Sequence, residues 1–305
     1  LVAFIGIILA TLLGIVIGVA RLSPNYLIKK TASFYIEFFR NIPLLLQIFF
    51  WYYAALRALP TPEAATLLLG SSFMTIKGLF TPAPIWTNFD VFFKALVIAM
   101  VLIFFFSRYA KKKQEQEGKQ LPTFIISLAI FMGLPLLTFL VGGVDLSFSF
   151  PVLRQMSQSS YTFDGGMGIP PELIALTLAL TLYTATFIAE NVRAGIQGIG
   201  IGQKEAAASI GLKPSQVLKL VIMPQALRII IPPTTNQYLN LTKNSSLAAA
   251  IAYPDLVLVF AGTAMMQTGK AIEIVGITMA TYLTISIAIS LLMNWYNQRI
   301  AIKEK

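Results

Sequence analysis

The chain has 305 residues, of which 56% are hydrophobic and 12% are charged, and its formal net charge is +10 at pH 7. A soluble domain carries about twice that charged fraction, so the composition indicates a polytopic membrane protein. The absence of cysteine and histidine from this sequence excludes disulfide frameworks, Cys or His metal sites and histidine acid–base catalysis. The scattered Lys and Arg residues form no basic face, which argues against nucleic acid as a partner.

Seven apolar runs are long enough to cross a bilayer core of about 30 Å as helices. The predicted spans are residues 1–20, 34–56, 91–107, 122–141, 170–192, 223–247 and 273–296. Their apolar residues are continuous and do not alternate, which excludes a barrel and predicts an all-α transmembrane helical bundle. The first run opens the sequence without a Met, and we expect further residues to precede it.

The basic residues predict the orientation of these spans. Most of them fall in segments that alternate along the chain and therefore share one side of the membrane: 21–40, 108–120, 193–228 and 299–305. By the positive-inside rule this side is the cytoplasm, and it includes the C-terminus. The external loops, 58–90 and 142–169, are rich in Pro, Gly, Ser and aromatic residues, and we expect them to be ordered but irregular.

These observations predict one transmembrane domain, residues 1–305, that carries two special segments. An additional span pair with its external loops occupies 58–168, and a charged cytoplasmic segment occupies 198–223. The glycines of the second segment lack a preceding strand and a G-x-x-x-x-G-K-[ST] pattern, so this chain is not expected to bind ATP. They instead predict a sharp turn, followed by a short helix that ends at Gly211 and a new helix that opens at Pro214.

The charged segment also carries a family resemblance. Its sequence contains Glu205-Ala206-Ala207, then Gly211, then Val221-Ile222-Met223-Pro224. This resembles the EAA---G---------I-LP signature of permease subunits of bacterial ABC importers, with Val221 and Met223 as conservative departures. In that family the segment is a coupling helix that fits a cleft of a separate ATPase subunit. The resemblance implies a role in coupling for Glu205, Ala206, Ala207, Gly211 and Pro224.

Other stretches narrow the resemblance to permeases for polar and general amino acids. They are FFRNIPLLLQIFFWYY (38–53), LTLYTATFIAENVRAGIQGI and QALRIIIPPTTNQYLNLTKNSSLAAAIAYPDL. The insertion resembles the longer type, in which a second, similar permease completes a heterodimer. The family implies a type I ABC importer permease fold in the bacterial inner membrane, surrounded by lipid. It further implies ATPase subunits that hold ATP and Mg, an external substrate-binding protein and amino acids as substrates, with no cofactor or metal in this chain.

The sixth predicted span is the richest in polar residues, and polar groups inside a span are costly and often functional. Its candidate substrate-path residues are Asn236, Asn240, Lys243, Asn244, Ser245 and Ser246. The first four are spaced by three or four residues and share a helical face, which offers donors for a carboxylate and acceptors for an ammonium group. The alternative is that these amides hold neighbouring helices together, with Lys243 structural near the external end.

Three further features of the spans concern an acidic residue, a proline with polar neighbours and a pair of prolines. Glu190 precedes Arg193 by three residues, which favours an ion pair within one helix. Arg40 and Gln47 flank Pro43 in the second span, and their pattern leaves open whether they contact a ligand. Pro232 and Pro233 are expected to bend the sixth span and free backbone carbonyls.

Three other classes of protein compete with the transport subunit. A secondary amino-acid transporter driven by an ion gradient predicts buried carboxylates, yet only Glu37 and Glu190 come near a span. A membrane-embedded enzyme would need a catalytic constellation, and the spans hold no His, Cys or carboxylate pair. A structural scaffold leaves the polar sixth span unexplained. Which amino acids are carried, and whether the dimer partner is a copy, stay open.

Overall fold

The computed structural model describes residues 1–65, 67–68, 70–118, 121–141, 143–157 and 160–300. The chain divides into two units, each described by itself. Unit 1 is Leu1–Thr61, Thr75–Gly78 and Ile169–Lys305, and unit 2 is Pro62–Met74 and Leu79–Gly168. The predicted cytoplasmic C-terminus, residues 301–305, lies outside the described residues.

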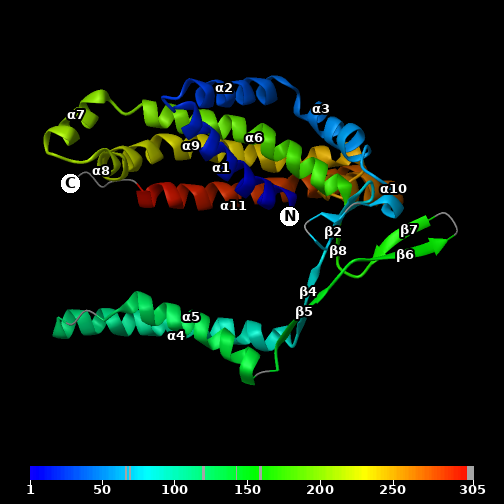
Figure 1. Ribbon diagram of the computed structural model, residues 1–305, viewed down its shortest axis with the longest axis horizontal. Coiled ribbons are helices and arrows are strands. Elements are labelled where there is room, and N and C mark those ends of the chain that lie inside the picture. Colours follow the sequence, from blue (N-terminus) through cyan, green and yellow to red (C-terminus); the bar gives the residue numbers. More distant parts are fainter. Residues whose placement is uncertain (66, 69, 119–120, 142, 158–159, 301–305) are drawn as a thin grey trace. The chain divides into compact units, whose positions relative to one another are not determined.

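Unit 1 is built mainly from helices (Figure 1). In chain order they are α1 (Val2–Arg21), α2 (Tyr26–Asn41), α3 (Leu44–Phe49), η1 (Phe50–Leu56), α6 (Pro171–Gln197), α7 (Ile201–Ser209), α8 (Pro214–Gln216), η3 (Val217–Ile222), α9 (Met223–Asn244), η4 (Ser245–Ile251), η5 (Leu258–Ala264), α10 (Met265–Thr268) and α11 (Ala271–Ile300). The end of α6, then α7 and α8, and the start of α9 gather at one end of this unit.

Helix α6 is the centre of unit 1, in contact with α1, α2, α3 and α9. Helix α1 lies closely against it because small residues recur every four positions, at Gly6, Ala10, Gly14 and Gly18, and all four are buried. A Cβ atom at Gly18 would lie 2.7 Å from the carbonyl oxygen of Ala189. Such a stripe lets two helix backbones approach more closely than larger side chains allow, which is a common way to pack helices in a membrane.

Six helices among the described residues are long and apolar enough to cross a membrane. They are Val2–Arg21, Phe89–Glu117, Thr123–Val141, Pro171–Gln197, Pro214–Ile251 and Ala271–Arg299. The predicted helical bundle is confirmed, with six such helices in place of about seven. The run at 34–56 is wrong as a single span because the chain breaks between α2 and α3. Pro43 disfavours a helical conformation for Ile42, whose backbone is extended.

The break between α2 and α3 is held by Gln47, which is buried. Its Nε2 atom donates hydrogen bonds to the carbonyl oxygens of Phe39 (2.7 Å) and Ile42 (2.9 Å). A helix end leaves its last carbonyl groups without donors, and Gln47 supplies them from the next helix. The glutamine therefore fixes the bend that Pro43 introduces.

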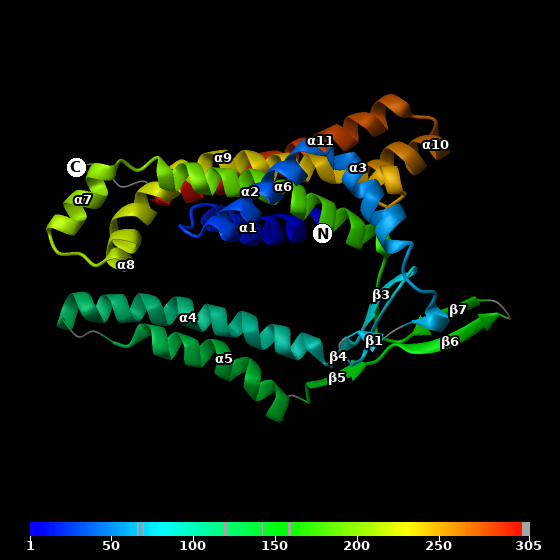
Figure 2. The ribbon, with the colours of Figure 1, turned by 45° about the horizontal axis from the view of Figure 1, so that its top comes forward.

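The chain between η1 and α6 forms a helical hairpin and short strands (Figure 2). Its elements are η2 (Pro62–Ala64), β1 (Leu67–Leu68), β2 (Ser72–Thr75), β3 (Gly78–Thr81), β4 (Ala83–Thr87), α4 (Phe89–Glu117), α5 (Thr123–Val141), β5 (Asp145–Ser149), β6 (Val152–Ser157), β7 (Ser160–Asp164) and β8 (Met167–Ile169). Helices α4 and α5 pack against each other along their lengths.

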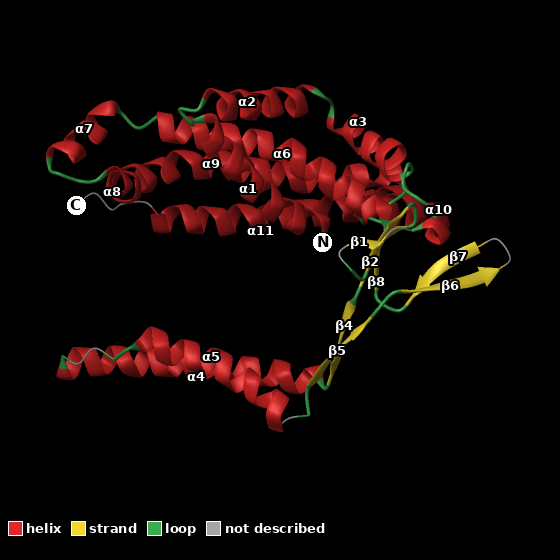
Figure 3. Ribbon diagram, viewed as in Figure 1, coloured by secondary structure: helices red, strands yellow, loops and turns green. Residues whose placement is uncertain are grey.

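The strands correct the expectation of irregular loops at 58–90 and 142–169 (Figure 3). They form one sheet in the order β1-β2-β3-β8 and the pairs β4-β5 and β6-β7. The β4-β5 pair is antiparallel, with Ala83 opposite Ser149 and Thr87 opposite Asp145. Strands of two to six residues are too short to show clear alternation among so many Gly and Pro residues.

Candidate functional site

The segment after α6 reverses the chain through a helix end that requires glycine. The N–H of Gly211 donates to the carbonyl of Ala208 (2.9 Å), and the N–H of Leu212 donates to that of Ala207 (3.2 Å). This pair of bonds is a Schellman motif, and Gly211 adopts a φ of +82° that favours glycine. Helix α7 thus ends just before Gly211, at the point that the sequence predicts.

The predicted coupling residues of α7 divide into one buried and several exposed positions. Ala207 is buried, and α7 contacts η3. Glu205, Ala206 and Gly211 are exposed. We conclude that Ala207 serves the packing of α7, whereas the exposed positions leave a surface of small side chains beside one carboxylate.

Pro224 connects this segment to the membrane helix. It lies at the second position of α9, directly after η3, where the helix has π-type hydrogen bonding. Proline has no N–H to donate to the carbonyl of Leu220, and its ring crowds that carbonyl. A wider turn before the proline relieves this conflict, so helical structure continues from Pro214 to Ile251.

One face of α9 packs within unit 1. Tyr238 shares a hydrogen bond of 2.9 Å with the hydroxyl of Thr11 on α1. A Cβ atom at Gly6 would lie 3.3 Å from Leu241, and one at Gly195 of α6 would lie 2.3 Å from Ile230. The absence of these Cβ atoms lets α9 sit directly against α1 and α6.

The other face of α9 is exposed, and beyond Ile229 most of its exposed residues are polar. Pro232, Asn236, Asn240 and Lys243 are exposed at steps of four, four and three residues, which keeps them in one row along the helix. Asn236 lies near the middle of the helical segment Pro214–Ile251. The structure thus places three of the six predicted substrate-path residues side by side in a row; we call this row of four the polar face.

The remaining three predicted path residues lie at the end of α9 and in η4, and they are half-buried. The hydroxyl of Ser245 donates to the carbonyl of Thr242 (2.8 Å), and that of Ser246 donates to the carbonyl of Lys243 (2.7 Å). Both hydroxyls therefore satisfy backbone groups where α9 changes into η4. Asn244 is the last residue of α9.

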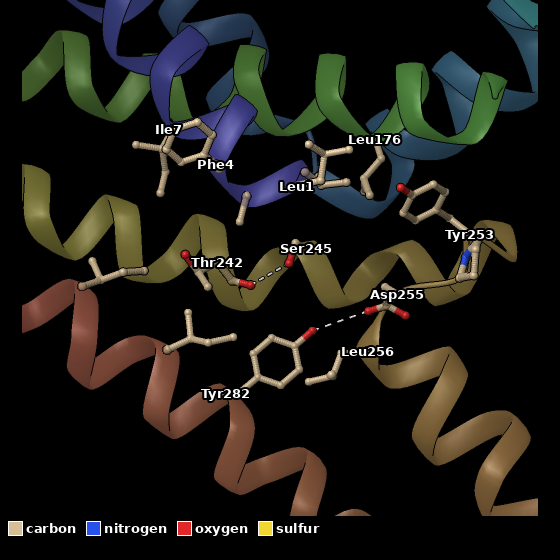
Figure 4. A pocket seen from close by; sticks show the side chains of 15 residues that line it. Leu1, Phe4, Ile7, Leu176, Thr242, Ser245, Tyr253, Asp255, Leu256 and Tyr282 are labelled. Carbon is tan, nitrogen blue, oxygen red and sulfur yellow. Dashed lines mark hydrogen bonds between the residues drawn. The ribbon is translucent and has the colours of Figure 1, made fainter. Parts of the chain in front are cut away.

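A cavity of about 570 Å³ lies near this helix end, walled by residues of α1, α6, α9 and α11 (Figure 4). Ser245 is the only predicted path residue on its wall. The hydroxyl of Tyr282 donates to one oxygen of Asp255 (3.5 Å), and the other oxygen accepts the N–H of Leu258 (2.8 Å). We did not predict the polar pair in this cavity, although an acidic residue just before a helical segment is a recognisable N-cap signal.

No family model matches the chain. The chain is 51% identical over 306 residues to YhdX of Escherichia coli (strain K12), whose name is that of an amino-acid ABC transporter permease. That match covers 100% of this chain and 77% of YhdX. The general L-amino acid transport system permease protein AapQ of Rhizobium johnstonii is 49% identical over 100% of this chain and 75% of its own length. The chain belongs to the permease subunits of amino-acid ABC transporters.

Two further comparisons agree with this membership. The permease protein BztB of a glutamate/glutamine/aspartate/asparagine transport system, from Rhodobacter capsulatus, is 40% identical over 94% of the permease described here and 73% of its own length. A chain in the crystal structure of an amino acid ABC transporter with histidines superposes with a TM-score of 0.54 at 20% identity. That match covers 98% of this permease and 88% of the other chain, and it shows a shared fold.

Family membership confirms the resemblance found in the sequence and decides against a carrier driven by an ion gradient. Together with the six apolar helices, it makes the permease a multi-pass protein of the bacterial inner membrane. The predicted path and coupling residues stay predictions, because neither the fold nor the family membership assigns them a role.

Glu190 of the permease forms the ion pair that its spacing predicts. The Nε atom of Arg193 lies 3.1 Å from each carboxylate oxygen of Glu190. Arg21 at the end of α1 also pairs with this carboxylate, which the sequence did not indicate. One acid therefore joins two arginines from two neighbouring helices, near the end of unit 1 that carries α7.

Arg40 has a different partner. Its guanidinium group lies 4.9 Å from the ring centroid of Phe187 on α6, a distance typical of a cation–π contact. Tyr35 adds a hydrogen bond from its hydroxyl to the carbonyl of Leu182 (2.9 Å). Together with Gln47, these contacts hold the bent pair α2 and α3 on α6.

Proposed function

We propose that the permease imports L-amino acids into the cytoplasm by alternating access, driven by ATP hydrolysis on separate subunits. The observation that carries this proposal is the polar face of α9, because it is exposed although it lies within a membrane-spanning helix. The hydrocarbon core offers no hydrogen-bond partners, so exposed amides there must face protein or a water-filled path.

The residues of the polar face suit a zwitterionic ligand. Lys243 and the amide N–H groups of Asn236 and Asn240 can donate to a carboxylate, while the amide oxygens can accept from an ammonium group. Such a lining serves amino acids with different side chains, because it recognises the carboxylate and ammonium groups that they share. Selectivity among them then rests largely on the external binding protein.

The prolines of α9 add backbone acceptors to this path. Pro232 and Pro233 have no N–H and cannot donate to the carbonyls of Arg228 and Ile229. Pro232 is itself exposed on the polar face, one turn from Asn236. The resulting weak point near the middle of the span is a suitable place for a gate.

The permease works with partners that supply the other steps. ATPase subunits bind ATP and Mg and dock at α7, a second permease or a copy of this one faces α9, and an external binding protein delivers substrate. Because α7 is connected directly to α6 and packs on η3, a force on α7 acts on two membrane helices at once. ATPase closure therefore rocks these helices, which changes access from one side to the other.

The names of two relatives support a substrate class. AapQ belongs to a general L-amino acid system and BztB to a system for glutamate, glutamine, aspartate and asparagine. We extend to this permease a preference for L-amino acids that includes polar and acidic ones. We place the cytoplasm at the α7 end of unit 1, where α11 also ends.

The coupling role is tested by purifying the tagged subunit and identifying the proteins that accompany it. We expect an ATPase with a G-x-x-x-x-G-K-[ST] motif in the wild type and its loss in Glu205→Arg. The matched control is Glu115→Arg, an exposed acidic residue of α4 outside the coupling segment, which should retain the ATPase. An ATPase that stays bound to Glu205→Arg would contradict docking at α7.

The path is tested by thiol labelling, which is practical because the sequence contains no cysteine. Asn236→Cys and Asn240→Cys should react with a membrane-impermeant thiol reagent in the assembled transporter, and substrate should slow the reaction. Ile98→Cys, exposed on α4, is the control that should not react. Asn240→Leu should also weaken uptake while the ATPase remains bound. Equal labelling of all three cysteine variants would count against a path along α9. So would labelling of the two α9 variants at a rate that substrate does not change.

A further inference from the structure

A second cavity, of about 260 Å³, opens where α1 ends, α2 begins and α6 ends. Its polar lining consists of Arg21, Ser23, Lys29, Ser33, Arg193 and Gln197. Three of these six side chains are cationic and none is acidic. We call it the basic cavity, and neither the transport path nor the coupling segment uses it.

The charges around the basic cavity are not balanced. Glu190 pairs with both Arg21 and Arg193, so three positive groups face one carboxylate and a net charge of +2 remains. Arg21 uses one nitrogen for this pair, whereas a guanidinium group carries five N–H donors. Such a site favours a ligand with negative charge and several acceptor oxygens, which are the properties of a phosphate group.

Two further groups in the basic cavity have hydrogen-bond donors that are not used within the described residues. The ammonium group of Lys29 and the hydroxyl of Ser33 form no hydrogen bond with any residue that the structure describes. The two residues lie four positions apart on α2, so they share a helical face. Together with the arginines of α1 and α6, they can surround an anion from three helices.

The surface next to the basic cavity is strongly apolar. Tyr26 and Leu27, at the start of α2, are 76% and 71% exposed, and Ile28 is 47% exposed. A helix that combines exposed apolar side chains with lysines lies readily at the membrane interface. A ligand that reaches the basic cavity from this side therefore meets a cationic pocket and an apolar surface together.

We infer that the basic cavity binds the phosphate headgroup of an anionic phospholipid, whose acyl chains lie along the exposed side of α2. Basic pockets between membrane helices are favourable sites for such headgroups. The apolar side chains at the start of α2 favour a lipid over a free anion, because inorganic phosphate gains nothing from them. A bound lipid would tie α1 and α2 to the end of α6 from which α7 departs.

The test is a titration of the purified transporter with phosphatidylglycerol in detergent, followed by native mass spectrometry. Lys29→Gln should weaken the binding of the first lipid about fivefold, since a Lys near an anionic lipid contributes about 1 kcal/mol. The matched control is Lys30→Gln, which removes the same charge from the next residue of α2 but not from the cavity, and it should bind like the wild type. An equal loss in both variants would overturn the site in favour of general surface attraction.

Two additional arms identify the source of the phosphate. Phosphatidylcholine with the same acyl chains should bind the wild type more weakly, and inorganic phosphate should neither bind measurably nor displace phosphatidylglycerol. Displacement by inorganic phosphate at millimolar concentration would overturn the lipid assignment. The melting temperatures of Lys29→Gln and Lys30→Gln, measured without lipid, should agree. Weaker lipid binding by Lys29→Gln would then not be due to unfolding.

Discussion

Helices α4 and α9 both expose side chains in the subunit, but these exposed surfaces have opposite chemistry. In the middle of α4, residues 95–106, the exposed residues are apolar, for example Ile98 (52% exposed), Phe104 (53%) and Phe105 (63%). Along α9 the exposed residues are Ile229, nearer its start, and then the polar face with Asn236 and Asn240. Lipid tails match the first surface and cannot satisfy the second. Exposure of a membrane helix therefore has two meanings, and the chemistry of the exposed residues distinguishes them.

The same contrast holds for whole helices. Helix α6 has a mean hydropathy of 1.7 over its most apolar stretch, and 56% of that stretch is buried, whereas α5 has 2.5 and only 6%. Helix α6 accommodates Thr184 and Thr186 because protein buries them, and the half-buried Glu190 is paired with Arg21 and Arg193. Helix α5 is thus more hydrophobic than α6 and yet far less buried, the reverse of the arrangement in a soluble core.

The largest expected effect comes from placing a carboxylate on each exposed surface. Ile98→Asp should lower the membrane-inserted fraction strongly, since an Asp at the centre of a lipid-facing helix costs about 2.5–3.5 kcal/mol. Asn236→Asp should insert normally, because protein or water already faces this position. Resistance to carbonate extraction measures both. Equal loss of insertion would show that the polar face of α9 meets lipid.

A smaller effect is expected when the same bulky side chain replaces a glycine in each region. Gly18→Leu drives a side chain into Ala189 and Val192, because even a Cβ atom would lie 2.7 Å from the carbonyl oxygen of Ala189 and 2.8 Å from Cβ of Val192. Overpacking of this kind costs about 1–3 kcal/mol. Gly133→Leu on α5 is the control, since among the described residues no atom beyond its own stretch of helix lies within 4 Å of a Cβ there. The melting temperature in detergent should fall for Gly18→Leu only. A similar fall in both variants would contradict the conclusion that α1 is closely packed at this position and α5 is not.

These contrasts also explain what the sequence can predict. Long apolar runs identify α1, α4, α5, α6, α9 and α11, because about 20 apolar residues are needed to cross the bilayer. The signature around Glu205 and Gly211 indicated both the helix α7 and the family. These features are local, so a short stretch of sequence contains all the information that defines them.

Features that depend on distant partners were missed. Arg21 is separated from Glu190 by 169 positions, and nothing in either stretch indicates that they pair. Pro43 is evident in the sequence, but an apolar run with one proline can either bend or break. The hydrogen bonds of the buried Gln47 stabilise a break, and the sequence does not show them. The small residues of α1 recur at four-residue steps in the sequence, from Gly6 to Gly18, but the sequence does not show that α6 packs against them.

The smallest expected effect compares one ion pair from each region. The pair Arg21–Glu190 is about one quarter exposed (24% and 27%), whereas Lys94–Asp90 on α4 is 72% and 64% exposed. Arg21→Gln should lower the melting temperature in lipid-free detergent by roughly 1–3 °C, because a partly exposed pair contributes at most about 1 kcal/mol. Lys94→Gln should leave it unchanged, because water and salt screen that pair. A larger effect at Lys94 would mean that α4 is covered by protein at this position and that its exposed surface is not entirely lipid-facing.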